Sequence, residues 1–189
     1  KGLYAITDPL LLSDDRLTVA VEQALLGGAR LIQYRDKSPH AARRLAQAGA
    51  LNELCRRHNV PLIVNDDVEL AARIGAAGVH VGKDDPGLAR ARARLGGKAI
   101  IGVSCYDRLD LALEAAQAGA DYIAFGAFFP SPTKPAEIRA PLELLRQARA
   151  ALSIPIVAIG GITPDNAPLL LDAGADALAV ISAVFAQPD

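Results

Sequence analysis

Short polar segments that suit anions recur along the chain, and each follows an apolar run. One is Ser131-Pro132-Thr133-Lys134, where a lysine stands beside two hydroxyls on a proline-containing loop. Hydroxyls, backbone amides and cations of this kind hold phosphate oxygens. Three similar segments are Gln33-Tyr34-Arg35-Asp36-Lys37, Asn65-Asp66 and Gly160-Gly161-Ile162-Thr163. Because each of them ends a strand-like run, the sequence predicts one site built from the ends of many strands.

The first polar segment along the chain alternates, with Gln33, Arg35 and Lys37 separated by single residues. Alternate residues of an extended chain point the same way, so we expect these three side chains on one face. Two cations and an amide suit a polyanion, and an arginine can engage two oxygens at once. The competing interpretation is a surface salt-bridge ladder that includes Asp36.

Carboxylates follow two neighbouring strand-like runs. Asp66 ends one run, and either Asp84 or Asp85 follows the next. Two carboxylates, completed by water and phosphate oxygens, match the way proteins hold Mg²⁺. Asp66 could instead be the N-cap of a helix that starts at Val68. For His80, at a strand end, contact with substrate and a purely structural role both stay open.

Later segments predict a second anion pocket. The loop 128–139 is the longest in the chain and is expected to act as a lid over bound phosphate. Gly160-Gly161 would let the backbone approach a ligand closely, and a helix beginning at Ile181-Ser182 would direct free N–H groups toward it. Cys105 has no nearby histidine in the sequence, which disfavours a nucleophilic role.

Composition narrows the class of partner. The chain has 189 residues, about half of them apolar, and a net charge of −1. That balance disfavours nucleic acid and anionic membrane surfaces as main partners. No apolar run approaches the ~20 residues of a membrane span. Two cysteines without metal-ligand spacing indicate a reducing cytoplasm. Arg90, Arg92 and Arg94 are expected on a solvated helix face, and assembly into a homo-oligomer is left open.

A weak internal repeat predicts the architecture. Its copies begin at Gly28, Gly75, Gly119 and Gly174, each after an Ala- and Leu-rich stretch and before apolar residues. The pattern is typical of a helix that ends at a left-handed glycine and leads into a buried strand. Copies stand about 45 to 55 residues apart, which is twice the length of one strand–helix unit.

Eight strands and amphipathic helices are expected between these glycines. Four further strand-like runs are Leu3–Thr7, Leu62–Val64, Ile100–Val103 and Ile156–Ile159, and four helical stretches are Leu17–Leu26, Ala41–Arg57, Leu109–Ala118 and Leu142–Ala151. This alternation predicts an α/β fold, a single (β/α)8 TIM barrel that spans residues 1–189 as one catalytic domain with the final helix largely absent. An open, doubly wound sheet is the alternative.

The motifs together resemble the thiamine-phosphate synthase family. The resemblance covers nearly the whole chain, in the family's order and spacing, and rests on seven segments. These are Tyr4-Ala5-Ile6-Thr7-Asp8, Gln33-x-Arg35-x-Lys37, Asn65-Asp66, Gly78 to Asp85, Gly102-Val103-Ser104, Ser131-Pro132-Thr133-Lys134 and Ile159-Gly160-Gly161-Ile162-Thr163. It implies a transferase that joins a hydroxymethylpyrimidine diphosphate to a thiazole phosphate, or its carboxylated form. By the family's chemistry, pyrophosphate would leave first, and the thiazole nitrogen would then capture the pyrimidine carbocation.

The resemblance also implies a role for each motif residue. The pyrimidine diphosphate would be held by Gln33, Arg35, Lys37, Asn65, Ser104 and Lys134. The thiazole phosphate would be held by Ser131, Thr133, Gly161, Ile181 and Ser182, and Mg²⁺ by Asp66 and Asp85. No general base is needed, because the attacking ring nitrogen carries no proton.

Two alternative functions remain at this point. A related branch with the same barrel isomerises the thiazole with a histidine where this chain has Tyr106. A tyrosine, with a pKa near ~10, poorly replaces an acid–base group that must work near neutral pH. A catalytically silent phosphate-binding barrel is the other alternative, and the retained metal and diphosphate residues argue against it. Ser131 for threonine and Lys83 for glutamine are the remaining departures from the family pattern.

Overall fold

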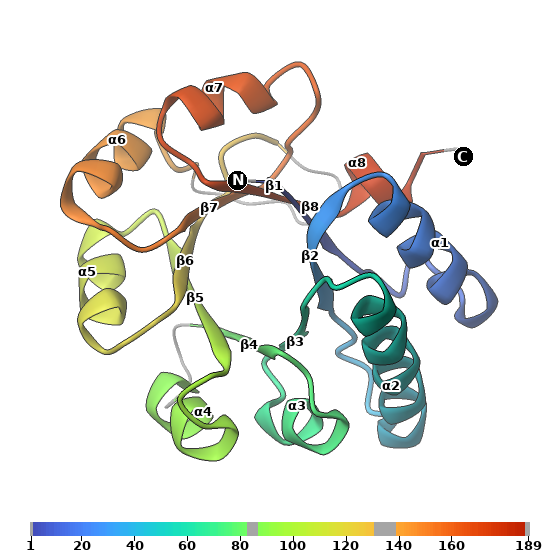
Figure 1. Ribbon diagram of the computed structural model, residues 1–189. Coiled ribbons are helices and arrows are strands. Elements are labelled where there is room, and N and C mark those ends of the chain that lie inside the picture. The colour runs from blue at the N-terminus through green and yellow to red at the C-terminus, as the bar shows by residue number, and fades with distance from the viewer. Residues whose placement is uncertain (1, 83–86, 131–138, 188–189) are drawn as a thin grey trace.

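Eight parallel strands close into a barrel in the computed structural model, which describes residues 2–82, 87–130 and 139–187. Each strand hydrogen-bonds to its sequence neighbours, and the last pairs with the first (Figure 1). The strands are β1 (Gly2–Ile6), β2 (Ala29–Tyr34), β3 (Leu62–Asn65), β4 (Gly78–Val81), β5 (Ile100–Tyr106), β6 (Tyr122–Phe125), β7 (Ile156–Ile159) and β8 (Ala177–Val180). The closed ring confirms the predicted barrel and excludes an open sheet.

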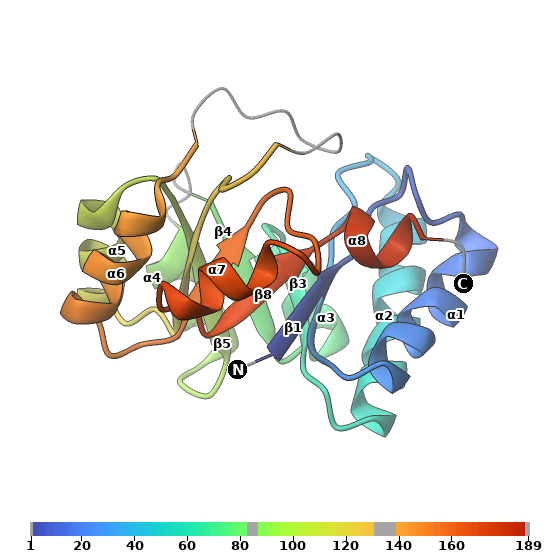
Figure 2. The ribbon, with the colours of Figure 1, turned by 90° about the horizontal axis from the view of Figure 1, so that it is seen from above.

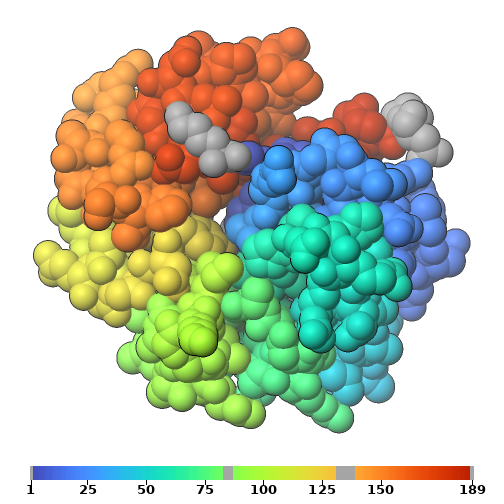
Figure 3. Space-filling model, in the orientation of Figure 1, coloured from blue at the N-terminus to red at the C-terminus, as the bar shows by residue number. Residues whose placement is uncertain are grey.

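Helices alternate with the strands and form the outer layer. They are α1 (Asp14–Leu26), α2 (Ala41–Arg57), α3 (Val68–Ile74), α4 (Gly87–Leu95), α5 (Leu109–Gln117), α6 (Leu142–Ala151), α7 (Ala167–Asp172) and α8 (Ser182–Phe185). In the view turned by 90°, α1 and α2 lie on the opposite side of the molecule from α5 and α6 (Figure 2). The space-filling view shows a notch in the outer ring between the orange-red α7 and the red α8 (Figure 3). None of the helices within the described residues has the length and apolar character needed to span a membrane.

Apolar side chains fill both faces of the strands. One cluster joins the first half of the barrel to its helices, and a second cluster does so for the other half. A third, small cluster lies inside the barrel around Tyr4, Ile6, Tyr122 and Val157. All residues of β4 and β6 are buried. Burial on two faces explains why these strands are nearly continuous apolar runs in the sequence.

The repeated glycines behave as the sequence predicts. Gly28, Gly75, Gly119 and Gly174 all have positive φ, between 64° and 115°. Each lies at the end of a helix, where the left-handed conformation turns the chain back toward the next strand. The sequence repeat therefore arises because several helices end in the same way, at a glycine with positive φ.

Arg92 on α4 ties together the loops before β5 and β6. Its guanidinium donates to the carbonyl oxygens of Ala99 (2.7 Å) and Gly119 (3.0 Å) and to Asp121 Oδ2 (2.7 Å). The same oxygen of Asp121 accepts the backbone N–H of Ile101 at 2.7 Å. Arg90 and Arg94 lie on an exposed face as expected, with side chains 62% and 51% exposed. Arg92 differs from them, because its side chain is 28% exposed and its donors are used by loop carbonyls and a carboxylate.

The same arrangement recurs one repeat later. Arg149 on α6 donates to Asp176 Oδ2 at 2.8 Å and to the carbonyl oxygen of Leu152, and Asp176 accepts the backbone N–H of Ile156 at 2.9 Å. We call the Arg92–Asp121 and Arg149–Asp176 pairs, with the carbonyls they bind, the arginine clamps. Both lie at the amino-terminal ends of strands.

Candidate functional site

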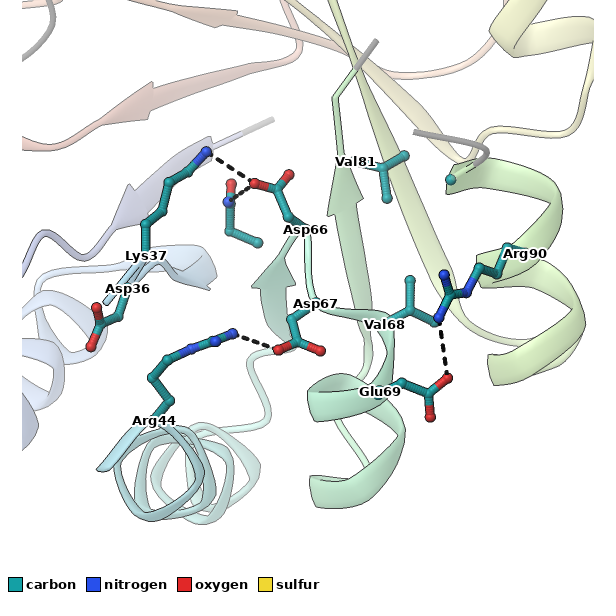
Figure 4. Close-up of a pocket in the computed structure, with 11 residues that line it drawn as sticks. Asp36, Lys37, Arg44, Asp66, Asp67, Val68, Glu69, Val81 and Arg90 are labelled. Carbon is teal, nitrogen blue, oxygen red and sulfur yellow. Dashed lines mark hydrogen bonds and ion pairs between the residues drawn. The ribbon is translucent and has the colours of Figure 1, made fainter. Parts of the chain in front are cut away.

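A cavity of about 360 Å³ opens where β2, β3 and β4 end. Its lining combines cations, carboxylates and an amide, among them Lys37, Asn65, Asp66 and Arg90 (Figure 4). Lys37, Asn65 and Asp66 come from segments that the sequence singles out. In barrels of this type the functional side chains lie at the carboxyl ends of the strands, and this cavity is in that position.

Lys37, Asn65 and Asp66 meet at this cavity. Lys37 Nζ lies 3.1 Å from Asp66 Oδ2, and Asn65 Nδ2 donates to the same oxygen at 2.7 Å. The side chains of Lys37 and Asp66 are 62% and 41% exposed, so both remain accessible to a ligand. Asp66 has φ of 59°, an uncommon left-handed value for a non-glycine residue, and its N–H donates to the carbonyl oxygen of His80 at 2.8 Å. Such backbone conformations cluster at functional sites.

The helix after Asp66 is capped by the next residue. Asp67 Oδ1 accepts the N–H of Leu70 at 2.9 Å, and its Oδ2 pairs with Arg44 at 2.5 Å. The alternative that Asp66 caps this helix is therefore wrong. Because Asp67 takes that role, the Asp66 carboxylate is directed toward the cavity (Figure 4).

The three alternating residues of the second segment have different surroundings. Gln33 is buried inside the barrel, whereas Lys37 reaches the cavity. Arg35 lies between them, with its guanidinium 3.9 Å from Asp8. The salt-bridge ladder through Asp36 does not form, since the buried Asp36 carboxylate turns to Arg43 at 3.3 Å. The cations at this strand end therefore pair with other carboxylates, Arg35 with Asp8 and Lys37 with Asp66.

A chain of hydrogen bonds crosses the barrel interior beneath this rim. Gln33 Nε2 donates to Tyr4 Oη at 2.7 Å, and Tyr4 Oη lies 2.8 Å from Tyr122 Oη. Tyr122 Oη is 2.9 Å from His80 Nδ1, and His80 Nε2 is 2.8 Å from Ser104 Oγ. His80 therefore has both ring nitrogens engaged. Its partner toward the open end of the barrel is Ser104.

Burial controls the charge of these interior groups. It lowers the pKa of His80 to about 4, and the nearby Asp66 carboxylate opposes this shift only in part. It also raises the pKa of Tyr4 and Tyr122 far above the ordinary tyrosine value. The interior chain is therefore neutral around pH 7. Burial likewise raises the pKa of the Cys105 thiol to about 12, so Cys105 is not an activated nucleophile.

The second anion-binding segment lies at the end of β7. Gly161 has φ of 62°, and a Cβ there would lie 2.2 Å from the carbonyl oxygen of Pro130. Only glycine allows this close approach of two backbones. The N–H of Phe129 donates to the carbonyl oxygen of Gly160 at 3.1 Å, so the start of the long loop runs along the end of β7. Ile181 is the N-cap of α8, which begins at Ser182 as expected.

Several predicted site residues lie outside the described residues. They are Asp85, Ser131, Thr133 and Lys134, together with the alternative carboxylate Asp84. Of the described ones, Lys37, Asn65 and Asp66 line the cavity, and Gln33, His80 and Ser104 belong to the interior hydrogen-bond chain. Gly161, Ile181 and Ser182 are at the ends of β7 and β8, apart from the cavity lining.

Two tyrosines of the interior chain were not predicted as site residues. Tyr4 and Tyr122 are 1% and 4% exposed. From the sequence alone, a tyrosine in an apolar strand is predicted to be a core residue without a role in the site. The available signal was that a buried tyrosine hydroxyl needs a polar partner, which Gln33 and His80 could supply. Thr7 was also missed, and its Oγ1 accepts the backbone N–H of Arg35 at 3.0 Å.

Comparison with known proteins agrees with this geometry. The sequence profile of the family described as thiamine monophosphate synthase matches residues 3–184. The thiamine-phosphate synthase of Thioalkalivibrio sulfidiphilus is 58% identical over 189 residues, which cover 100% of this chain and 90% of that protein. That of Nitrosococcus oceani is 57% identical over 189 residues, covering 100% and 87%. Among solved structures, the thiamine phosphate pyrophosphorylase from Pyrococcus furiosus matches with a TM-score of 0.87 and 38% identity, covering 100% of this chain and 89% of that one. The chain therefore belongs to the thiamine monophosphate synthase family.

Proposed function

We propose that this chain joins a hydroxymethylpyrimidine diphosphate to a thiazole phosphate and releases pyrophosphate, forming thiamine phosphate. The observation that carries the proposal is the meeting of Lys37, Asn65 and Asp66 at a cavity on the carboxyl ends of the strands, in a chain of this family. A cytoplasmic setting is proposed as well, supported by the free thiols of Cys55 and Cys105.

The cavity suits the diphosphate of the first substrate. Lys37 supplies an exposed ammonium, and Asn65 supplies an amide beside it. Arg35 follows β2 at the same strand end as Lys37, Ser104 lies on β5, and the family motif adds Lys134 and Gln33. Negative charge grows on the departing pyrophosphate, so cations fixed at this end lower the barrier to its departure.

The carboxylate of Asp66 fits a Mg²⁺ ligand. It is exposed to the cavity, and the N-cap of α3 is the neighbouring residue Asp67. Within the described ranges no three His, Cys, Asp or Glu side chains are placed to hold a metal ion together. Mg²⁺ in proteins is commonly held by one or two carboxylates, with water and substrate oxygens as its other ligands. Asp66, with Asp85 from the family motif, would hold the ion. Bound there, Mg²⁺ would neutralise charge on the pyrophosphate.

The thiazole phosphate is assigned to the ends of β7 and β8. Gly161 follows β7, and its missing side chain lets the described start of the long loop lie against it. Ile181 and Ser182 begin α8, and the family motif adds Ser131 and Thr133. This is the position at which barrels of this type commonly hold a phosphate.

The chain's own residues then have limited chemical tasks. They bind two phosphorylated molecules, orient the thiazole nitrogen toward the pyrimidine, and keep water from the cation formed when pyrophosphate leaves. None of them has to remove a proton. His80 is buried with both nitrogens engaged, and the exposed residue after the Gly-Val-Ser strand is Tyr106, which disfavours the tautomerase alternative.

A synthesis assay with matched carboxylate variants tests the proposal. The protein is incubated with both substrates and Mg²⁺, and thiamine phosphate and pyrophosphate are measured. Asp66→Asn should lose activity by about a hundredfold or more, and excess chelator should stop the unmutated protein. Asp67→Asn should stay within about threefold, because asparagine caps a helix as well as aspartate does.

The controls separate folding from chemistry. Circular dichroism should show the same melting behaviour for Asp66→Asn as for the unmutated protein. Absence of thiamine phosphate with folded, unmutated protein would refute the synthase assignment. Equal activity of the two Asn variants would remove Asp66 from the metal site.

A further inference from the structure

The hydrogen-bond chain through the barrel interior has a direction. It starts at Gln33 Nε2, an amide nitrogen that can only donate, and this nitrogen donates a hydrogen bond to Tyr4 Oη. Tyr4 has one hydroxyl proton, and Tyr122 Oη at 2.8 Å is the acceptor in reach. Tyr122 in turn has one proton for His80 Nδ1 at 2.9 Å. If both tyrosines donate in this direction, His80 Nδ1 is an acceptor, its imidazole proton lies on Nε2, and Nε2 donates to Ser104 Oγ at 2.8 Å.

We propose that Tyr4, Tyr122 and His80 are positioning residues that fix His80 as the Nε2–H tautomer and thereby make Ser104 present its hydroxyl proton to the substrate. Ser104 Oγ accepts from His80, so its own proton is free to point away from the barrel interior. Neither tyrosine touches the cavity at the rim; both act through His80. This inference rests on the proposed function in one respect, namely that the partner of Ser104 is an anion.

The reverse direction would be unfavourable at the substrate end. If Ser104 donated to His80, it would face the diphosphate with lone pairs alone. A hydroxyl that donates to an oxyanion forms a strong, charge-assisted hydrogen bond, whereas lone pairs directed at one are repelled. The donor at Gln33 and the anion expected near Ser104 therefore favour the same direction.

Packing holds the chain of groups in place. The Tyr122 ring stacks on the His80 ring with centroids 5.5 Å apart and meets the Tyr4 ring edge-on at 6.0 Å. Gly102 makes room for it, since a Cβ at this position would lie 1.9 Å from Tyr122 Cζ. Burial raises the pKa of both tyrosines far above the ordinary value, so each keeps its hydroxyl proton around pH 7.

Nitrogen NMR on the unmutated protein tests the tautomer directly. Long-range proton–nitrogen spectra of protein with labelled histidines distinguish a protonated ring nitrogen from an unprotonated one. The His80 signals are identified as those missing from His80→Gln, with His40 and His58 as internal references. We expect a protonated Nε2 and an unprotonated Nδ1. A dominant Nδ1–H form would reverse the chain, with the amide oxygen of Gln33 facing Tyr4, and would overturn the proposal.

Kinetics test whether Tyr122 acts through Ser104. Tyr122→Phe removes one hydroxyl, and we expect kcat to fall about tenfold, the factor of one well-aligned hydrogen bond in a buried site. In a Ser104→Ala background the same change should cost less than about twofold, because residues that act as one unit are not additive. Tyr34→Phe is the matched control. Its buried hydroxyl bonds to Gln47 at 2.7 Å outside this chain, so kcat should not change.

The outcomes are distinct from those of the synthase assay. Equal losses for Tyr122→Phe with and without Ser104 would refute action through the serine, even in an active enzyme. The tautomer is measured on protein without substrate, so the NMR result supports or refutes the proposed direction whether or not thiamine phosphate is formed. If a Tyr122 variant does not fold, the NMR result on the unmutated protein still decides the direction.

Discussion

Acidification should destabilise this protein through His80. Burial lowers the pKa of His80 from 6.5 to about 4, so the unfolded chain binds a proton before the folded one does. The stabilising contribution is therefore complete above pH 6.5 and is lost as the pH falls toward 4. At about pH 5 nearly all unfolded chains and about a tenth of folded ones carry this proton, which costs about 2 kcal/mol relative to about pH 7.

The groups that face the imidazole determine this loss. Tyr4 and Tyr122 stay neutral across this range because burial raises their pKa values, so neither compensates a charge on His80. Asp66 is the carboxylate that favours the protonated imidazole, and its effect on the pKa of His80 is smaller than that of burial. A charged His80 would also lose its acceptor role toward Tyr122.

The assay compares urea unfolding of the unmutated protein and His80→Gln, followed by circular dichroism, at about pH 7 and about pH 5. His40 and His58 are present in both proteins, so their titration cancels in the difference. The free energy of unfolding should fall by about 2 kcal/mol more in the unmutated protein. Parallel pH dependences of the two proteins would show that His80 does not have a lowered pKa, and the reasoning would be refuted.

Two further pairs of variants test the packing and the clamps. Gly102→Ala should lower the free energy of unfolding by more than about 2 kcal/mol, since the new Cβ would clash with Tyr122. In Gly49→Ala the new Cβ has no atom within 4 Å, so the free energy of unfolding should rise by up to about 1 kcal/mol. Arg92→Ala should cost about 2 kcal/mol because Asp121 and loop carbonyls lose their donor, and the exposed Arg146→Ala should change stability by less than about 0.5 kcal/mol. Urea unfolding measures both, and equal effects within a pair would contradict the respective explanation.

Much of the fold could be predicted because the signals are local. The helices 41–57 and 142–151 have the predicted bounds, since their apolar periodicity and flanking residues decide where they begin and end. The repeated glycines predict helix ends by a property of a single residue, its access to positive φ. Strand order followed from the same regularity, because parallel strands joined by helices have few ways to close.

From the sequence, contacts between site residues could be predicted only where the residues lie at the ends of neighbouring strands. Lys37 and Asp66 meet because β2 and β3 are adjacent, which the strand order implies. Which of two consecutive aspartates caps α3 depends on the left-handed backbone at Asp66, and no residue type signals that. The contact between Tyr4 and Tyr122 joins residues far apart in the chain across the barrel interior, so only the closed structure reveals it.

The arginine clamps separate what keeps the barrel closed from what acts on substrate. Both pairs, Arg92–Asp121 and Arg149–Asp176, lie at the amino-terminal ends of the strands, whereas the cavity with Lys37 and Asp66 opens at the carboxyl ends. Loops at the carboxyl ends can therefore change in sequence without removing a clamp. Mutations that change activity often reduce stability. In this barrel that conflict is reduced, because substitutions in the loops at the carboxyl ends do not alter the residues of the arginine clamps. Evolution can thus explore new specificity at one end of this barrel while selection maintains its folding at the other.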